Sequence, residues 1–334
     1  MSTHAIIRGL GFYVPPKVLT NADLETFVET SDEWITTRTG IKQRHVVEPG
    51  VPVSSLAVEA AKNALADAGM EAEELTHIFM ATLTPDTYCP SAACYLEEKL
   101  GIRGRMAVDC NAACSGFLYT THLARAMTLL EPGAKVLVCS GEVLTSRINW
   151  NDRATCVLFG DGCGAVVITA PDTPAGANKT VATIVDTKLS SDGSLADLLT
   201  VKGGGSSRPL AYGEATGDEF YIQMMGREVY KHAVRSMEAV STEMLERNGL
   251  TTDDVDLFVP HQANLRIIEA VGKKLGFAEG KVFVNVDRYG NTSAASVPIA
   301  LAEARATGAI KPGYKVLVTT FGGGFTWGST LLQF

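Results

Sequence analysis

Apolar residues along this chain fall into two kinds of pattern. Between positions 56 and 65, leucine and alanine recur at helical spacing, with Ser54 placed to cap the helix and Gly69 just beyond its end. A strand at 77–82 is expected to follow. Four near-continuous apolar runs predict further strands that are buried on both faces: 135–140, 255–259, 282–286 and 315–320. Because such strands occur in sheets covered by helices, the pattern predicts an α/β fold.

Parts of the chain repeat at a fixed offset. The stretch EPGAKVLV at 131–138 recurs as KPGYKVLV at 311–318, a shift of 180. The same shift aligns 64–79 with 244–259. One offset shared by two separate stretches predicts two copies of a single structural unit.

A third pair of matching stretches requires a shorter shift. The run FGDGCG that begins at 159 aligns with FGGGFT at 321, a shift of 162. The first copy therefore carries about 18 additional residues, around 141–158, and insertions of that length are often functional. We expect two duplicated halves, 1–172 and 173–334, because a chain of 334 residues also exceeds the usual size of one core.

The composition describes a well-buried globular protein. Hydrophobic residues make up 46% of the chain and charged residues 20%, which argues against disorder. No signal-like start and no apolar run of membrane-spanning length occurs, so a cytoplasmic location and no membrane are expected. The net charge of −8 provides no broad surface for nucleic acid. An anionic ligand would need a local basic patch.

The seven cysteines all lie between positions 89 and 163. Their odd number, without a secretory signal, argues against a disulfide framework. Their spacings do not match the usual zinc patterns, so no metal is expected.

One cysteine occupies a position suited to nucleophilic chemistry. The sequence around Cys114 predicts a strand through Val108, a short turn, and a helix from about Ser115 to Leu130. A helix N-terminus stabilises a thiolate, which would lower the thiol pKa, and its N–H groups can hold an oxyanion. Alternatively, Cys114 is a small buried apolar residue, as free cysteines often are.

A histidine and an asparagine each follow a predicted strand and precede a helix. His261 stands in VPHQANLRI and Asn291 in DRYGNTSAASVP, although a structural histidine and an Asx turn are the plainer interpretations. The shift of 180 maps Asn291 onto Asn111, three residues before Cys114. If the two copies bring these loops together, the cysteine, histidine and asparagine share a pocket suited to thioester chemistry.

Gly323 lies in the glycine-rich run FGGG at 321–324. This run leads into a predicted strand, unlike a phosphate-binding loop, which leads into a helix. Gly323 could bring a backbone N–H close to a reacting carbonyl, or it could simply form a tight turn.

Four motifs together resemble one family of condensing enzymes. VDCNAACSGF, VPHQANLRI, DRYGNTSAASVP and FGGGFTWGS occur in the order found in the β-ketoacyl-[acyl carrier protein] synthase III family of bacterial fatty acid synthesis. The resemblance covers nearly the whole chain. It implies a thiolase-like fold of five αβαβα layers with two pseudo-duplicated halves, a homodimer, and no cofactor besides a coenzyme A thioester as substrate.

The resemblance also implies a reaction. Cys114 would be acylated by an acyl-CoA primer, acetyl-CoA by default. His261 and Asn291 would bind the thioester carbonyl of malonyl-acyl carrier protein and stabilise the enolate formed as CO2 leaves. The N–H groups of Cys114 and Gly323 would form the oxyanion hole. The products would be 3-oxoacyl-acyl carrier protein, CoA and CO2, and the reaction would initiate fatty acid synthesis.

Binding residues are implied in the same way. Trp34 and Arg153 would lie on either side of the adenine of CoA, Arg38 would meet its phosphates, and Gly226 and Asn264 would line the pantetheine tunnel. Without the resemblance, Trp34 would be a half-buried packing residue and both arginines solvated surface charges.

Two further sets of residues follow from the family pattern. Docking of the carrier protein is implied for basic residues that otherwise form a solvated helix face: Lys231, Arg266, Lys273 and Lys274. The acyl pocket would include Tyr88 and Cys89. Many relatives carry a bulky residue where this chain has Cys89, so branched or longer primers stay open.

Three other functions are compatible with parts of the pattern. A related acyltransferase of quinolone or polyketide pathways would also load Cys114 but use another acceptor. A Cys/His/Asn hydrolase would release the acyl group to water, although the papain-type signature is absent. A carrier-binding module without catalysis would leave Cys114 unreactive.

Overall fold

The large sheet of the protein is built from strands that are distant in sequence. The computed structural model describes residues 4–211, 213 and 216–334. Within them, nine strands pair in the order β11-β12-β13-β8-β1-β7-β6-β4-β5. Their bounds are β1 Ala5–Tyr13, β4 His77–Ala81, β5 Met106–Cys110, β6 Lys135–Glu142, β7 Gly162–Thr169, β8 Ala182–Ser191, β11 Leu257–Pro260, β12 Lys315–Gly322 and β13 Thr326–Gln333.

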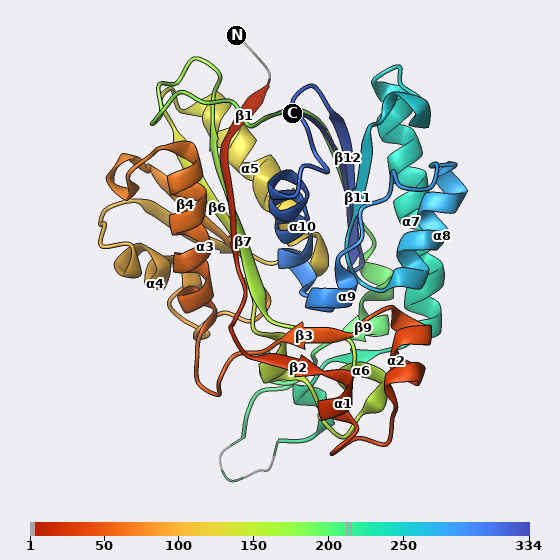
Figure 1. Cartoon of the computed structure of the whole chain (residues 1–334). Coiled ribbons are helices and arrows are strands. Elements are labelled where there is room, and N and C mark those ends of the chain that lie inside the picture. The colour runs from red at the N-terminus through yellow and green to blue at the C-terminus, as the bar shows by residue number, and fades with distance from the viewer. Residues whose placement is uncertain (1–3, 212, 214–215) are drawn as a thin grey trace.

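The sheet is divided into two halves where β1 meets β8. These strands pair only through Ala5–Ile7 and Ala182–Ile184, whereas β1 pairs with β7 along nearly its whole length. Figure 1 shows the halves diverging around two central helices, α5 (Gly116–Leu130) and α10 (Ser296–Ala306). A buried apolar core from both halves and both helices fills this space.

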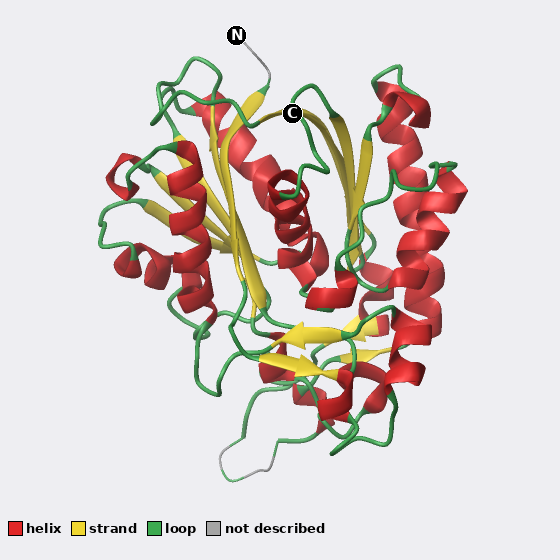
Figure 2. Cartoon of the chain, viewed as in Figure 1, coloured by secondary structure: helices red, strands yellow, loops and turns green. Residues whose placement is uncertain are grey.

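Helices also cover the outer faces of both halves. On one side lie α3 (Val53–Ala68) and α4 (Ala92–Lys99), and on the other α7 (Gly226–Arg247) and α8 (Leu265–Leu275). The order of layers is therefore helix, sheet, helix, sheet, helix (Figure 2). This confirms the predicted five-layer α/β architecture.

The internal repeat is visible in the elements themselves. Two 3₁₀ turns, η2 (Ala113–Ser115) and η7 (Ser293–Ala295), precede α5 and α10, and both turns and both helices begin 180 positions apart. The same offset relates the starts of β6 and β12. The exact boundary between the halves, at 172/173, stays a prediction.

Short elements gather at the lower end of the molecule in Figure 1. They include part of the extra stretch at 141–158, which forms η3 (Leu144–Arg147) and α6 (Arg153–Cys156). The others there are α1 Asn21–Leu24, α2 Asp32–Thr39, α9 Val286–Tyr289, β2 Val18–Thr20, β3 Gln43–His45, β9 Leu199–Thr200 and β10 Gln223–Met224. Elsewhere along the described chain, 3₁₀ turns form at η1 Ala72–Glu74, η4 Gly193–Leu198, η5 Asp218–Phe220 and η6 Thr252–Asp254.

Most of the strands predicted from apolar runs are present, but the one at 282–286 is wrong. Val282 makes only an isolated bridge to Phe258, and the chain turns into α9 at Val286. The cause is the buried side chain of Gln262. Its amide donates to the carbonyl of Phe283 at 3.1 Å and accepts from the N–H of Asn285 at 2.9 Å. A side chain therefore takes backbone groups that a strand ladder would have used.

The predicted ends of the helix at 56–65 are correct at one terminus only. Gly69 ends α3 in the left-handed conformation, with φ of 64°. Ser54, however, lies inside the first turn, and Pro52 is the N-cap. The backbone N–H of Ser54 donates to the carboxylate of Asp86 at 3.0 Å, so Asp86 satisfies a donor at this helix terminus.

Candidate active site

Cys114 lies in a tight turn between β5 and α5, as the strand-turn-helix pattern predicts. Its side chain is buried. The turn is closed by Asn111, whose Oδ1 accepts from the N–H of Ala113 at 3.1 Å. Ala113 adopts a positive φ of 46°, which is uncommon for a residue with a side chain. The backbone thus takes an unusual conformation at Ala113, the residue that precedes Cys114.

Asn291 occupies the equivalent turn in the second half. Its Oδ1 accepts from the N–H of Ser293 at 2.9 Å. Its backbone is held by the first half, because its N–H donates to Leu158 at 2.8 Å and its carbonyl accepts from Gly160 at 3.1 Å. Since the turn uses Oδ1, the side-chain N–H₂ is the polar group that Asn291 can offer to a ligand.

His261 follows β11, and its backbone N–H donates to Thr319 of β12 at 2.8 Å. Its Nδ1 lies 2.6 Å from the hydroxyl of Ser296. That hydroxyl also accepts from the N–H of Gln262 at 3.4 Å, so we assign its own proton to Nδ1 of the imidazole. This assignment leaves the proton of the neutral ring on Nε2, where it can be donated to a ligand.

One cavity of about 660 Å³ joins these three side chains. Cys114, His261 and Asn291 all line it. Gly226 and Asn264 line the same cavity, together with four exposed cations: Arg38, Arg227, Lys231 and Arg266. The space therefore extends from a buried sulfur to a positively charged surface. Arg227 was not singled out from the sequence, where it is one of many surface cations.

A second cavity of about 580 Å³ also borders Cys114. Its lining includes Asn111, Ser293, Gly323 and the exposed Tyr88. Apolar residues dominate the remainder, among them Leu83, Leu144, Phe159, Leu199, Val201 and Ile222. Cys89 is exposed and is not part of this lining. Cys114 thus lies where two spaces adjoin, one lined by cations and one largely apolar, and Phe159 and Leu199 also border both.

The comparisons with known proteins agree with this geometry. The family model for 3-oxoacyl-[acyl-carrier-protein (ACP)] synthase III matches residues 108–193, and the model for its C-terminal part matches 245–334. A β-ketoacyl-[acyl-carrier-protein] synthase III of Nitratidesulfovibrio vulgaris is 58% identical, with all of both chains covered. The chain belongs to the β-ketoacyl-[acyl-carrier-protein] synthase III family. It is therefore an acyltransferase of the thiolase superfamily that performs the initiating condensation of fatty acid synthesis.

Solved structures extend the similarity to three dimensions. The synthase III of Aquifex aeolicus is 46% identical, with a TM-score of 0.89, 99% of this chain and 100% of that chain covered. The priming β-ketosynthase of the R1128 polyketide pathway is 32% identical, with a TM-score of 0.87 and coverage of 98% and 96%. The thiolase-like fold expected from the motifs is thus confirmed.

The electrostatics around the sulfur of this synthase III differ from the expectation. Burial raises the pKa of the Cys114 thiol to about 11, and the charge of Glu142 acts in the same direction. A hydrogen bond from the Ser293 side chain opposes the rise. The predicted depression of the thiol pKa is therefore wrong. Cys114 lies in η2, ahead of α5, which begins at Gly116, and the loss of solvation outweighs the helix terminus.

The imidazole is also neutral at physiological pH. Burial lowers the pKa of His261 to about 3. A neutral ring with its proton on Nε2 can donate a hydrogen bond but carries no charge.

Gly322 lies in close contact with the turn that carries Cys114. A Cβ on Gly322 would lie 2.6 Å from the backbone nitrogen of Cys114, which no side chain permits. Gly323 has more space, since its nearest contact would be the carbonyl of Leu199 at 3.0 Å. Gly322 therefore fixes β12 against the nucleophile turn, and Gly323 borders the second cavity beside Cys114.

The residues expected to bind the adenine of CoA form one cluster. The guanidinium groups of Arg38 and Arg153 each lie 4.7 Å from the ring centre of Trp34. Arg153 also donates to the carbonyl of Glu29 at 2.8 Å. Trp34 comes from α2 and Arg153 from α6 in the extra stretch, so tertiary packing brings the two together.

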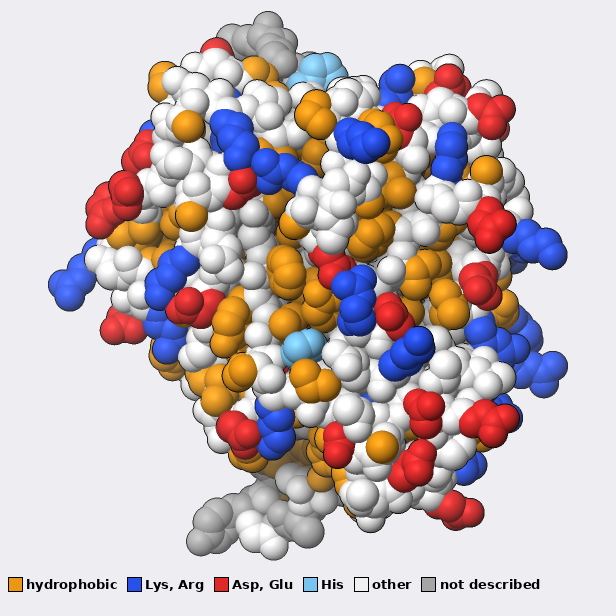
Figure 3. All heavy atoms as spheres, in the orientation of Figure 1, with side chains coloured by type: hydrophobic (Ala, Val, Ile, Leu, Met, Phe, Trp, Pro, Cys, Tyr) orange, Lys and Arg blue, Asp and Glu red, His pale blue; other side chains and the backbone are white. Residues whose placement is uncertain are grey.

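The predicted docking residues lie on two adjacent helices. Lys231 is on α7, while Arg266, Lys273 and Lys274 are on α8. Lys231 and Arg266 line the first cavity, but Lys273 and Lys274 do not. Lys231 pairs with Glu228 at 2.8 Å and Lys274 with Glu238 at 2.7 Å. Figure 3 shows lysine and arginine side chains at the right-hand edge, beside α8.

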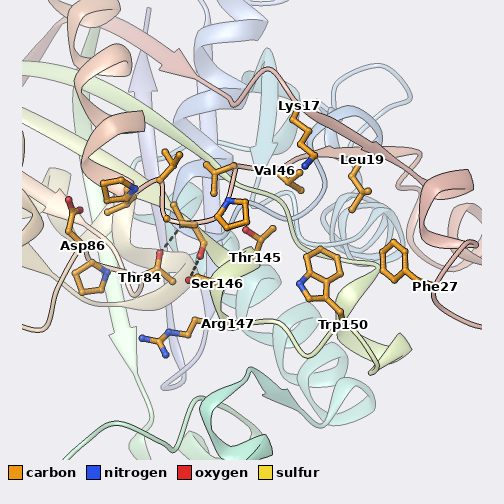
Figure 4. A pocket seen from close by; sticks show the side chains of 18 residues that line it. Lys17, Leu19, Phe27, Val46, Thr84, Asp86, Thr145, Ser146, Arg147 and Trp150 are labelled. Carbon is orange, nitrogen blue, oxygen red and sulfur yellow. Dashed lines mark hydrogen bonds between the residues drawn. The ribbon is translucent and has the colours of Figure 1, made fainter. Parts of the chain in front are cut away.

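A third cavity, of about 800 Å³, lies away from the sulfur (Figure 4). Phe27 and Trp150 line it as an edge-to-face pair with ring centres 5.9 Å apart. Its described lining contains no cysteine or histidine. It shares Arg147 and Asp86 with the second cavity, so the two spaces adjoin. Cavity volume alone would therefore have favoured this third cavity over the two that border Cys114.

No group of three or more His, Cys, Asp or Glu side chains in the described part of the chain could hold a metal ion. None of the helices in residues 4–211, 213 and 216–334 has the length and apolar character needed to cross a membrane.

Proposed function

We propose that this synthase III catalyses a decarboxylating Claisen condensation between an acyl-CoA primer and malonyl-acyl carrier protein. Acetyl-CoA is the default primer. The observation that carries the proposal is the shared cavity, in which the Cys114 sulfur, the His261 imidazole and the Asn291 carboxamide border one space. A nucleophile and two neutral donors are the groups that thioester condensation requires.

In the first half-reaction, the Cys114 sulfur attacks the carbonyl of the acyl-CoA. The S–C bond to the enzyme forms and the bond to the CoA sulfur breaks. The proton lost by the Cys114 thiol is matched by one that the departing CoA thiolate takes up. The N–H groups of Cys114 and Gly323 stabilise the oxyanion. The close contact at Gly322, which holds β12 against this turn, supports such a pairing of N–H groups.

In the second half-reaction, His261 and Asn291 hold the thioester carbonyl of the malonyl group. The Nε2–H of His261 and the side-chain N–H₂ of Asn291 donate to this oxygen. As CO2 leaves, negative charge develops there as an enolate, and two preorganised donors stabilise it. The enolate carbon then attacks the acyl-cysteine, and Cys114 departs as a thiolate.

The cationic cavity suits both substrates. Trp34 and Arg153 bind the adenine of CoA, Arg38 its phosphates, and Gly226 and Asn264 the pantetheine arm. The Trp34 cluster supports this assignment, because aromatic and guanidinium groups both stack on bases.

The acidic carrier protein docks on the basic residues of α7 and α8: Lys231, Arg266, Lys273 and Lys274. Arg227, beside the cavity, extends this set. On a protein with a net charge of −8, a local cluster of cations favours encounter with an acidic partner.

The second cavity receives the acyl chain of the primer. Its lining from Leu83 to Ile222 is largely apolar, which favours alkyl groups. Tyr88 lines this cavity, and in the family pattern the residue at position 89 closes the acyl pocket from the neighbouring subunit. Because a small residue stands at position 89, branched or longer primers are also candidates.

Two copies of the chain assemble as a homodimer through the free edge at β5. This strand ends the sheet, so its outer backbone groups are unpaired within the described chain. Met106 and Val108 on it are 50% and 41% exposed. An apolar edge strand suits pairing with a second copy of itself.

The decisive experiment measures covalent loading. Intact-mass spectrometry after mixing with acetyl-CoA should show one added acetyl group, and Cys114→Ala should show none. Addition of malonyl-acyl carrier protein should then yield the 3-oxoacyl product and restore the free thiol. An unchanged mass of the wild-type protein would reject the proposal.

A second candidate keeps the loading step but changes the acceptor. The similarity to the R1128 priming β-ketosynthase favours this alternative. This second candidate is supported if the acyl-enzyme forms, does not react with malonyl-acyl carrier protein, and transfers its acyl group to a different acceptor. Loss of the acyl group to water alone would instead indicate a hydrolase.

A further inference from the structure

Arg44, in the middle of the short strand β3, is a cation with no exposed surface. Its Nη1 donates to the carbonyl of Leu19 at 3.2 Å and to the Oδ1 of Asn21 at 2.9 Å. Its Nη2 donates to the carbonyl of Val157 at 2.6 Å. All three acceptors are neutral. Because a buried guanidinium held by neutral groups is costly, the segments that it joins are where a function is expected.

The guanidinium of Arg44 stays charged although it is buried. Burial lowers its pKa to about 10, and the nearby Cys156 acts in the opposite direction. Burial also raises the pKa of the Cys156 thiol to about 11, so this thiol is neutral at pH 7. The hydrogen bonds of Arg44 are therefore charge-assisted, which makes them stronger than bonds between neutral groups.

The segment that the Nη2 of Arg44 contacts also holds the backbone of Asn291. Val157 is followed by Leu158, whose carbonyl accepts from the N–H of Asn291 at 2.8 Å. The N–H of Gly160 donates to the carbonyl of Asn291 at 3.1 Å. Both backbone groups of Asn291 are thus held by a segment that is itself bonded to Arg44.

The stem of the Arg44 side chain lies against the same two segments. A Cβ on Gly160 would lie 3.0 Å from the Cβ of Arg44, and a Cβ on Gly290 would lie 3.2 Å from it. Gly290 directly precedes Asn291 and has a positive φ of 65°. Since neither glycine has a side chain, β3 can approach both segments closely. A displaced Arg44 would therefore disturb the turn of Asn291 from two sides.

The other end of the guanidinium is tied to α2, the helix of the proposed adenine cluster. Asn21 is buried and accepts from Arg44 through Oδ1. Its Nδ2 donates to the Oδ1 of Asp32 at 2.8 Å and to the carbonyl of Ile41 at 2.8 Å. Asp32 begins α2, and Ile41 follows the C-cap of that helix. Hydrogen bonds therefore connect both ends of α2, through Asn21 and Arg44, to the segment that holds Asn291.

We propose that Arg44 is a positioning residue for condensation, which fixes the turn of Asn291 relative to α2. The inference rests on the proposed function, because it assumes that the Asn291 carboxamide holds the malonyl thioester carbonyl. Arg44 borders neither cavity beside Cys114, so it acts through other residues and does not touch the substrate. A donor displaced by about 1 Å can slow a reaction by roughly 100-fold, so a fixed turn matters for the second half-reaction.

The test measures loading and condensation separately, each in a single turnover. Saturating acetyl-CoA first loads the protein, and rapid quenching with intact-mass spectrometry gives the loading rate. The acetyl-enzyme is then mixed with malonyl-acyl carrier protein, and formation of the 3-oxoacyl product is timed. Arg44→Met keeps an unbranched apolar stem and removes all three donors. We expect its condensation to slow by roughly 10- to 100-fold, while saturated loading changes by less than about threefold.

Arg44→Lys tests whether the planar, forked guanidinium is required. Lysine keeps the charge but cannot reach the Leu19, Asn21 and Val157 acceptors with one rigid group. The condensation rate of this variant should therefore lie between those of Arg44→Met and the wild type.

Arg8 provides a matched control, because it is also a buried arginine with neutral acceptors. It is 3% exposed, and it donates to Thr169 Oγ1 at 2.8 Å and to backbone carbonyls at 170, 171, 173, 178 and 179. It borders neither cavity beside Cys114. Arg8→Met should lower thermal stability, as Arg44→Met does, and leave the ratio of condensation to loading at the wild-type value.

Asn21→Ser gives an answer even if no Arg44 variant folds. It leaves Arg44 in place but removes the Oδ1 that accepts from it and the link to Asp32. Condensation should again fall relative to saturated loading, and the KM for acetyl-CoA should rise, because α2 loses one of its attachments.

The outcomes separate this inference from the proposed function. If the wild-type protein does not load, or if Asn291→Asp condenses as fast as the wild type, the proposed function fails. If both behave as proposed, but the Arg44 and Asn21 variants that fold lose loading and condensation equally or lose neither, the positioning role alone is wrong.

Discussion

Asn111 and Asn291, 180 positions apart, close the same backbone turn in the two halves of the molecule. Each Oδ1 accepts from the N–H two residues later, at 3.1 Å in Asn111 and 2.9 Å in Asn291. The residues that follow, Ala113 and Ser293, have positive φ angles of 46° and 51°. The duplicated turn thus presents a thiol, that of Cys114, in one half and the carboxamide of Asn291 in the other.

This relationship separates the structural role of Asn291 from its chemical role. Asn291→Asp keeps an oxygen to close the turn but removes the side-chain N–H₂. We expect acetyl loading of Cys114 to persist, while formation of the 3-oxoacyl product falls by about 10²- to 10³-fold. Asn111→Asp makes the matched change in the other half and should retain far more condensation. An equal loss of 3-oxoacyl product formation in Asn291→Asp and Asn111→Asp would contradict the proposed role of the Asn291 side chain as a donor.

His261 should make the stability of the protein sensitive to acid. Its pKa is about 3 when folded and ~6.5 when unfolded, so the unfolded chain binds more protons between these values. Its contribution to stability is therefore complete above pH ~6.5 and decreases below it, by at most about 1.4 kcal/mol per pH unit. Urea denaturation at several pH values should show a shallower decline for His261→Gln. An identical decline would contradict the buried neutral imidazole.

Gly322 should tolerate no side chain. The Cβ of Gly322→Ala would meet the backbone of Cys114, and we expect a loss of roughly 1–3 kcal/mol in stability. Acyl loading should fall as well, because the turn that carries the sulfur must move. Gly193→Ala is the control, since a Cβ there meets no heavy atom within 4 Å. Thermal unfolding and loading measured together test this, and a wild-type result for Gly322→Ala would refute it.

Trp34 should affect substrate binding more than chemistry. Trp34→Leu removes the ring that Arg38 and Arg153 contact, and we expect the KM for acetyl-CoA to rise roughly tenfold while kcat changes little. Trp150→Leu alters a tryptophan in the third cavity and should leave this KM near the wild-type value. A fall in kcat without a change in KM for Trp34→Leu would argue against adenine binding here.

The free edge of β5 should determine the oligomeric state. Val108→Lys places a charge on an exposed apolar position of this edge, so the protein should shift from dimer to monomer. Leu210→Lys introduces the same charge at another exposed apolar residue and should stay dimeric. Sedimentation velocity distinguishes the two states. A dimeric Val108→Lys variant would place the interface elsewhere.

The prediction from sequence was most accurate where local rules decide structure. Near-continuous apolar runs and helical spacing identified the α/β layers, and the offset of 180 identified the duplication. Cys114 was recognised because a strand, a turn and a helix follow one another within a short stretch. The error at 282–286 shows the limit of this reasoning, since the side chain of Gln262 replaced the pairing that an apolar run predicts.

The sequence by itself therefore indicated the α/β layers, the repeat and the three candidate side chains, those of Cys114, His261 and Asn291. Only the tertiary structure decided their electrostatic state and their partners. Burial raises the pKa of Cys114 and lowers that of His261, and burial depends on the packing of whole layers. Glu142 contacts Ser293 across 151 positions of sequence. Such a contact has no local signal, because it forms only when two separate halves fold against each other.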